Sequence, residues 1–167
     1  MAKRLVIILE SPLGSDGEEL LAWLVRRLSI DRTQWVKTYC YPKNRKTLPK
    51  KKRERQKRLA PYVDRLVEFI EYNEPCVLIG MGKLSSEVLL GVTMIKKVTG
   101  SKRRTQLPFM LMENHREAWI VDSPNAALFD PNLAVNISQI IWAAALEAGL
   151  PAEIDYNVRL FDWSKYI

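Results

Sequence analysis

Short apolar runs alternate with stretches in which apolar residues recur every three or four positions. Arg4–Leu9 and Cys76–Met81 are continuous apolar runs, which are typical of parallel strands buried on both faces. Trp35–Tyr41 is rich in aromatic and β-branched residues, and Trp119–Asp122 also predicts a strand. Because strands and helices alternate, the pattern predicts an α/β fold with a parallel sheet and right-handed crossovers.

The helices are predicted from apolar residues at helical spacing. Asp16 is expected to cap the first helix, and Pro61 to mark a break or a new first turn in the second. Gly100–Thr105 is expected to be a polar loop, and Ala152–Ile167 to add an edge strand. Four helices are predicted. They are one that contains Leu20 to Leu28, one from about Lys50 to Ile70, one over Ser85–Leu90 that ends at Gly91, and one over Asn132–Gly149.

The predicted architecture is a single domain over residues 1–167, a three-layer sandwich around a four-stranded, mostly parallel sheet. A chain of 167 residues fits one compact domain. In such sheets ligands bind beyond the carboxyl ends of the strands, where loops and helix N-termini meet. The segments expected at that edge are Glu10–Gly17, Tyr41–Lys52, Gly80–Ser85 and Asp122–Asn125.

Positive charge is concentrated in one segment of the chain, whose net charge is +7. Between Lys43 and Arg58 there are ten Lys or Arg and one Glu, whereas the remainder holds 16 basic and 18 acidic residues. This distribution predicts a docking surface for a polyanion, with DNA as the expected partner. A solvated helix face or a disordered arm is the alternative interpretation.

Phosphate contacts are assigned to this segment and to a second basic cluster, which is expected in a loop near the same sheet edge. Ser85 is added because small residues can offer backbone N–H groups to a phosphate. The basic candidates are Lys43, Arg45, Lys50, Lys51, Lys52, Arg53, Arg55, Lys57 and Arg58, and in the second cluster Lys102, Arg103 and Arg104. Tyr39, Tyr41 and Trp119 are expected to pack in the core rather than stack on bases.

No cofactor and no metal are expected. Cys40 and Cys76 lie in apolar stretches and are interpreted as buried thiols in a reducing compartment. No Gly-x-x-x-x-Gly-Lys-Ser/Thr or Gly-x-Gly-x-x-Gly motif follows a strand, which argues against nucleotide triphosphate and dinucleotide enzymes. With no apolar run near 20 residues and no signal-peptide pattern, the prediction is a cytoplasmic protein without a membrane partner.

From about Val6 to Leu150, five short segments follow one another in a particular order. They are Ile8-Leu-Glu-Ser-Pro12, Lys37–Arg45 continuing into Asn44-Arg-Lys-Thr-Leu-Pro49, Val77-Leu-Ile-Gly-Met-Gly-Lys83 with Leu89-Leu-Gly91, Ile95-Lys-Lys-Val-Thr-Gly100, and Val121-Asp-Ser-Pro-Asn-Ala126. Together they resemble the uracil-DNA glycosylase superfamily, particularly its bacterial family 4 and phage members. The resemblance implies a DNA partner and hydrolytic release of uracil or another modified base. The residues that it places at the DNA are Ser11, Pro12, Asn44, Ser123, Pro124 and Asn125.

The sequence departs from the family at positions that carry chemistry. An iron–sulfur cluster on four cysteines is usual in family 4, but this chain has two cysteines, so no cluster is expected. The loop Leu13–Glu18 has no aromatic residue to stack on uracil. Lys37 or Thr38 stands near the uracil-reading Asn of the family, and Asp122 or Ser123 replaces the His of its second motif.

Hydrolysis of an N-glycosidic bond needs an aligned water and stabilisation of the departing base, on a nucleotide flipped into a tight pocket. Glu10 is the first candidate to orient the water, Asp16 is the second, and Asp122 is a third catalytic candidate. Helix capping by Asp16 and an Asx turn at Asn125 are the structural alternatives, whereas capping is not expected of Glu10 after a buried strand. His115, the only histidine, is interpreted as an exposed loop residue.

Two hypotheses therefore remain for the function. In one, the chain is a DNA glycosylase with altered or lost uracil specificity. In the other, it is a non-catalytic derivative that binds DNA or a partner protein, in phage replication or counter-defence. A small-molecule hydrolase is a third, less favoured interpretation.

Overall fold

The computed structural model describes residues 2–109 and 116–166 and contains one five-stranded sheet. The strands are β1 (Arg4–Leu9), β2 (Trp35–Tyr39), β3 (Cys76–Met81), β4 (Ser101–Arg104) and β5 (Glu117–Val121), in the spatial order β2-β1-β3-β5-β4. Four of them are parallel, and β4 alone runs antiparallel, against β5. The α/β class and the mostly parallel sheet are confirmed.

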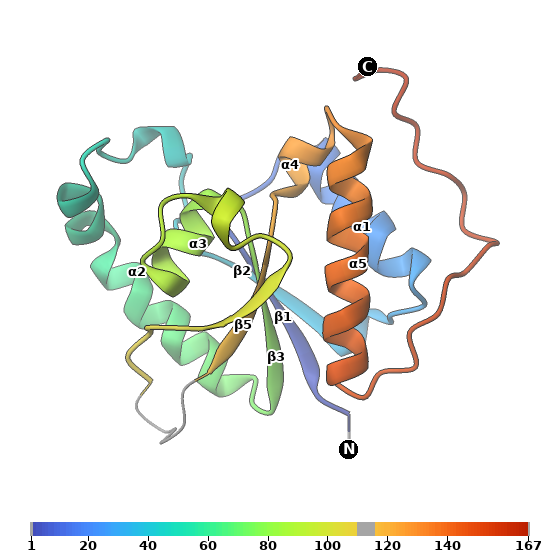
Figure 1. Cartoon of the computed structure of the whole chain (residues 1–167), viewed down its shortest axis with the longest axis horizontal. Helices are drawn as coiled ribbons and strands as arrows, with labels where there is room; N and C mark the ends of the chain where they lie inside the picture. Colours follow the sequence, from blue (N-terminus) through green and yellow to red (C-terminus); the bar gives the residue numbers. More distant parts are fainter. Residues whose placement is uncertain (1, 110–115, 167) are drawn as a thin grey trace.

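Helices cover both faces of this sheet, which gives three layers (Figure 1). On one face lie α1 (Ser15–Arg27), the short α4 (Pro124–Ala127) and α5 (Pro131–Glu147). On the other lie α2 (Lys52–Tyr72) and α3 (Lys83–Leu90). Single 3₁₀ turns complete the connections at Arg32–Gln34, Arg45–Thr47 and Ile95–Lys97.

The core divides between the two faces as the period of a strand requires. Leu5, Ile7 and Leu9 of β1 pack with α1 and α5, whereas Val6 and Ile8 pack with α2 and α3. All five side chains are essentially inaccessible to solvent. This two-sided burial explains why the run is apolar throughout rather than alternating with polar residues.

The expected loop at 100–105 is instead the edge strand β4, so the sheet has five strands and not four. No residue of this strand is fully buried, and its exposed Arg103 and Arg104 give no apolar pattern. Lys102 lies 5.6 Å from the ring of Trp119 and pairs with Glu147 of α5. A strand held by backbone pairing and a basic side chain leaves no hydrophobic signal in the sequence.

Two further expectations about single elements were wrong. Helix α2 continues through Pro61 without a break, because Pro61 lies on its exposed side while the buried Leu59 and Leu66 anchor the helix to the core. The described tail residues 152–166 form no strand. They run beside α1, where the indole N–H of Trp23 donates to the Arg159 carbonyl at 2.6 Å.

Within the described ranges, no helix combines the length and apolar character needed to cross a lipid bilayer.

Candidate nucleic-acid interface

A cavity of about 860 Å³ opens at the carboxyl edge of the sheet, and we call it the sheet-edge cavity. Four loops that are distant in sequence form its walls, as the parallel topology predicts. They are the segments after β1, after β2, after β3 and after β5. The residues that line it are Glu10, Ser11, Pro12, Leu13, Gly14, Pro42, Lys43, Asn44, Arg45, Lys46, Gly82, Lys83, Ile95, Asp122, Ser123, Asn125, Ala126 and Phe129.

Glu10 is the most buried acid of this cavity, with 8% of the residue exposed. Its Oε2 accepts a hydrogen bond from the Leu84 backbone N–H at 2.8 Å and another from Arg45 Nη1 at 3.0 Å. Glu10 therefore caps the N-terminus of α3, contrary to the expectation that it would not act as a cap. Its other oxygen accepts no hydrogen bond from the described part of the chain.

Gly82 makes the close approach of Glu10 to α3 possible. Its φ is +99°, and a Cβ added there would lie 2.5 Å from the Glu10 carboxyl carbon. Side chains are disfavoured both by this backbone conformation and by the lack of space. The glycine after β3 thus positions the carboxylate that follows β1.

The loop after β5 supplies another wall of the cavity. Ser123 caps α4 by accepting a hydrogen bond from the Asn125 N–H at 3.3 Å, and Pro124 is the buried first residue of that helix. The Asn125 side chain lies against Gly17 of α1, where a Cβ would be 2.1 Å from its Oδ1. Asp122 lines the cavity without an ion pair to any residue in the ranges 2–109 and 116–166.

The loop after β2 brings the first cations of the basic segment into the same cavity. Asn44 caps the 3₁₀ turn by accepting from the Lys46 N–H at 2.9 Å, so its side chain has a structural role. Cations of this segment also affect the pKa of Tyr41. The pKa of the Tyr41 phenol is lowered, first by its hydrogen bond with Thr47 and then by nearby Arg58 and Lys43.

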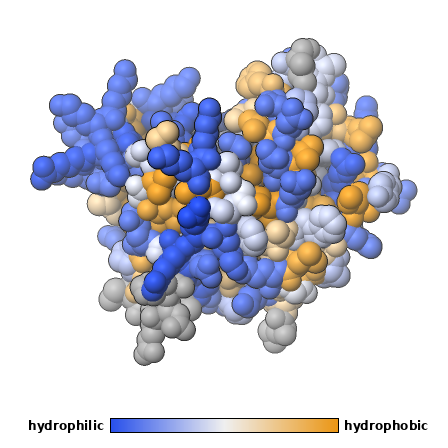
Figure 2. All heavy atoms as spheres, in the orientation of Figure 1, coloured by the Kyte–Doolittle hydropathy of each residue, from blue (hydrophilic) through white to orange (hydrophobic). Residues whose placement is uncertain are grey.

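The rest of the basic segment extends along the outside of α2 and protrudes from the molecule, at upper left in Figure 2. Lys50 and Arg55 line a second cavity beside the first. Lys51 is the N-cap residue of α2, and Lys52 Nζ donates to the Gly91 carbonyl at 3.0 Å. Arg53, Lys57 and Arg58 are exposed on the first half of the helix and line neither of these cavities.

Several predicted site residues lie elsewhere. Asp16 is in the first turn of α1, which Gly14 caps without a side-chain bond, so the expected cap is wrong. It contacts Lys165 at 3.4 Å and does not line the sheet-edge cavity. Ser85, whose backbone N–H was expected to face a phosphate, is fully buried and lines neither cavity, and its hydroxyl donates to the Met81 carbonyl at 2.9 Å.

The second basic cluster was also misplaced. In the antiparallel pairing of β4 with β5, Arg104 stands beside Glu117, the first residue of β5. Strand β4 therefore runs away from the carboxyl edge of the sheet. Lys102, Arg103 and Arg104 line neither of the two cavities described above. Any contact of these three residues with DNA would therefore be made away from the cavity loops.

Lys46, Lys83 and Phe129 are among the cavity residues that were not assigned to the site from the sequence. Lys46 belongs to the basic segment, and Lys83 follows the glycine at the end of β3, so both could have been found from the expected sheet edge. Phe129 could not, because it lies in the turn between α4 and α5. Its side chain is 69% exposed at the cavity wall.

Both cysteines are buried and free, as expected, and burial raises the pKa of each thiol to about 12. Tyr41 is buried as predicted, whereas Tyr39 and Trp119 are only partly covered. No cluster of three or more metal-ligating side chains occurs among the residues that the structure describes. His115 lies outside the described residues.

No protein-family model and no curated protein matches this sequence.

Proposed function

We propose that the chain binds DNA through the sheet-edge cavity and the basic segment Lys43–Arg58. The observation that carries this proposal is the convergence of Lys43, Arg45, Lys46 and Lys83 on one cavity. Only Arg45 among these four has an ion-pair partner within residues 2–109 and 116–166. Three lysines without an ion-pair partner favour a phosphate backbone as the ligand.

The distribution of charge along α2 supports the same function. Lys51, Lys52 and Arg53 stand at the N-terminal end, where the helix dipole disfavours cations, while the last turn carries no basic residue. In the free chain this arrangement is unfavourable to the helix. It is favourable when an anionic strand lies against that end of the helix.

The proposal is tested by fluorescence anisotropy with labelled single-stranded DNA, duplex DNA and RNA of one sequence. The variant Lys43→Glu/Lys46→Glu removes two exposed cations of the cavity that make no ion pair with a described residue. Binding should weaken at least tenfold, and the salt dependence of log Kd should become less steep by about two.

Arg26→Glu/Arg32→Glu is the matched control, because it makes the same charge change at two exposed residues between the last turn of α1 and β2, and neither residue lines a cavity described above. Its affinity should stay within about twofold of the original. Equal losses in both variants would show that net charge alone attracts DNA. A tighter complex with RNA than with DNA would also overturn the proposal as stated.

A second candidate function is hydrolytic base excision in the same cavity. It is favoured because Glu10 lines the same cavity as Asp122, Ser123 and Asn125, and one of its carboxylate oxygens accepts no hydrogen bond from the described residues. In this reaction a water oxygen bonds to the sugar C1′ while the N-glycosidic bond breaks and its electron pair leaves with the base. Glu10 would orient that water and take its proton.

Excision is tested on single strands and duplexes that carry uracil, hydroxymethyluracil or hypoxanthine. Glu10→Gln keeps an oxygen to cap α3 but cannot take a proton, so base release should fall by at least a hundredfold. Unchanged release would exclude Glu10 as the water-orienting group. DNA binding without release of any base would leave binding as the function.

A further inference from the structure

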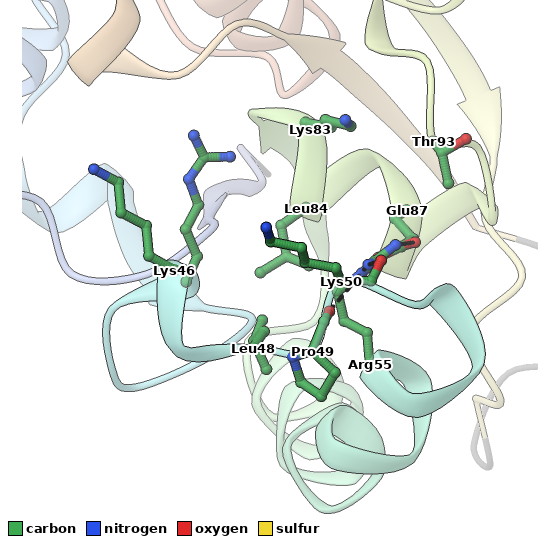
Figure 3. Close-up of a pocket in the computed structure, with 10 residues that line it drawn as sticks. Lys46, Leu48, Pro49, Lys50, Arg55, Lys83, Leu84, Glu87 and Thr93 are labelled. Carbon is green, nitrogen blue, oxygen red and sulfur yellow. Dashed lines mark hydrogen bonds and ion pairs between the residues drawn. The ribbon is translucent and has the colours of Figure 1, made fainter.

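A second cavity of about 460 Å³ lies next to the sheet-edge cavity and shares Arg45, Lys46 and Lys83 with it (Figure 3). It is formed between the loop that precedes α2 and the start of α3. Its size falls within the range of pockets that hold small organic ligands. Because three side chains line both cavities, a strand could pass from one into the other.

The inner surface of this second cavity is apolar. Leu48 and Leu84 are both buried members of the core on the α2 side of the sheet, and Pro49 lies beside them. In Figure 3 Leu84 lies among the three lysines, and Leu48 and Pro49 lie below them. An apolar surface of this kind favours a planar, uncharged ring over a bare ion.

Lysines surround this apolar surface, and we therefore name it the lysine-rimmed cavity. Lys46, Lys50 and Lys83 are exposed, and none makes an ion pair with another residue of the described ranges. The one acid that lines the cavity is Glu87, which is 5% exposed. It is already neutralised, since Arg55 binds both of its oxygens.

The same Arg55 holds the cavity wall in place. Its guanidinium also donates to the backbone carbonyls of Pro49, at 3.2 Å, and Lys50, at 2.7 Å. The buried pair with Glu87 thus ties the loop to α3. A wall that is fixed before a ligand arrives reduces the entropy lost on binding.

From these contacts we infer that the lysine-rimmed cavity binds one nucleotide unit, with its base against Leu48, Pro49 and Leu84 and its phosphate among Lys46, Lys50 and Lys83. The combination is selective. A free inorganic anion would leave the apolar surface uncovered, and an uncharged ring would leave the lysines without a partner. The inference deepens the proposed DNA binding and rests on it for the source of the nucleotide, which is an unstacked residue of a bound strand.

The test uses single strands of about 12 nucleotides in which the fluorescent adenine analogue 2-aminopurine occupies one position at a time. Its fluorescence is quenched by stacking, so it should rise several-fold when the labelled base enters the cavity. Thr93→Trp places an indole at the cavity wall, away from the core. Thr99→Trp adds the same group at an exposed position that lines neither cavity.

With anisotropy confirming that the strand is bound, we expect the fluorescence rise with the original chain and with Thr99→Trp, and its loss with Thr93→Trp. A bound strand that shows no rise at any position overturns the inference and leaves the proposed function intact. If no strand binds, the proposed function fails, and deoxynucleoside monophosphate is titrated instead. A monophosphate that binds the original chain but not Thr93→Trp identifies a free nucleotide as the source, whereas inorganic phosphate binding equally well overturns the inference.

Discussion

At the residue scale, the contact between Gly82 and Glu10 joins two loops that sequence patterns treat separately. Gly82→Ala should destabilise the fold through both its positive φ and the overlap with the Glu10 carboxyl group. Gly100→Ala is the matched control, because Gly100 has φ +80° and open space around its missing Cβ. The control should cost about 1–2 kcal/mol in urea unfolding, and Gly82→Ala at least about 2 kcal/mol more.

A double-mutant cycle separates the two causes at Gly82. In a Glu10→Ala background the overlap is gone, so the cost of Gly82→Ala should fall to that of Gly100→Ala. If Gly82→Ala lowers the free energy of unfolding equally in both backgrounds, the Glu10 side chain is not the cause of the steric overlap at position 82.

The two cysteines give a second prediction at this scale. Burial raises the pKa of both thiols to about 12, so almost no thiolate forms in the folded chain at pH 8. Iodoacetamide should label neither Cys40 nor Cys76 in the native protein at that pH, and both after unfolding in urea. Rapid labelling of native Cys40 would contradict the placement of its side chain beside Ser85.

The raised pKa values of the two thiols also predict how the stability of the fold changes with pH. Since the folded pKa lies above the ordinary thiol value of 9.0, the folded state holds its thiol protons where the unfolded chain loses them. Their contribution to stability is complete below about pH 9 and is lost as pH rises toward 12. Replacing both cysteines with alanine should flatten the unfolding free energy across that window, as measured in urea at each pH.

At the element scale, α2 carries cations where its dipole favours anions. Lys51→Asp would provide the N-cap carboxylate that the helix lacks, and Arg53→Glu would place an acid in the first turn. Each change should stabilise the chain by about 0.5–1 kcal/mol in urea unfolding while weakening DNA binding at least fivefold. Loss of stability in either variant would show that these cations support the fold itself.

The elements that could be predicted from the sequence are those whose side chains are buried. The apolar β1 and β3 were recognised because two layers of helices cover them. Strand β4 was not, because backbone pairing at a sheet edge imposes no apolar alternation on its four residues. The capping role of Glu10 was missed for a related reason, since its partner Leu84 is 74 residues away and no local pattern connects them.

At the scale of the whole molecule, positive charge is concentrated in one segment, and the repulsion within that segment opposes folding at low salt. The ten basic residues of Lys43–Arg58 repel one another within roughly a Debye length, which is about 10 Å at 0.1 M salt. Added NaCl should therefore raise the free energy of unfolding of the free chain, by about 1 kcal/mol between 20 and 300 mM.

The same salt should weaken the DNA complex by three to five decades between about 50 and 200 mM, if six or more phosphates are contacted. Stability and binding thus change in opposite directions, because salt screens both the repulsion among these cations in the free chain and their attraction to phosphates in the complex. Replacing Lys50, Lys51 and Arg53 with glutamine should reduce both salt dependences together. Urea unfolding and anisotropy, each measured across the salt series, test this coupling. A free energy of unfolding that does not change with salt in the original chain would show that the segment carries its charge at no cost to the fold.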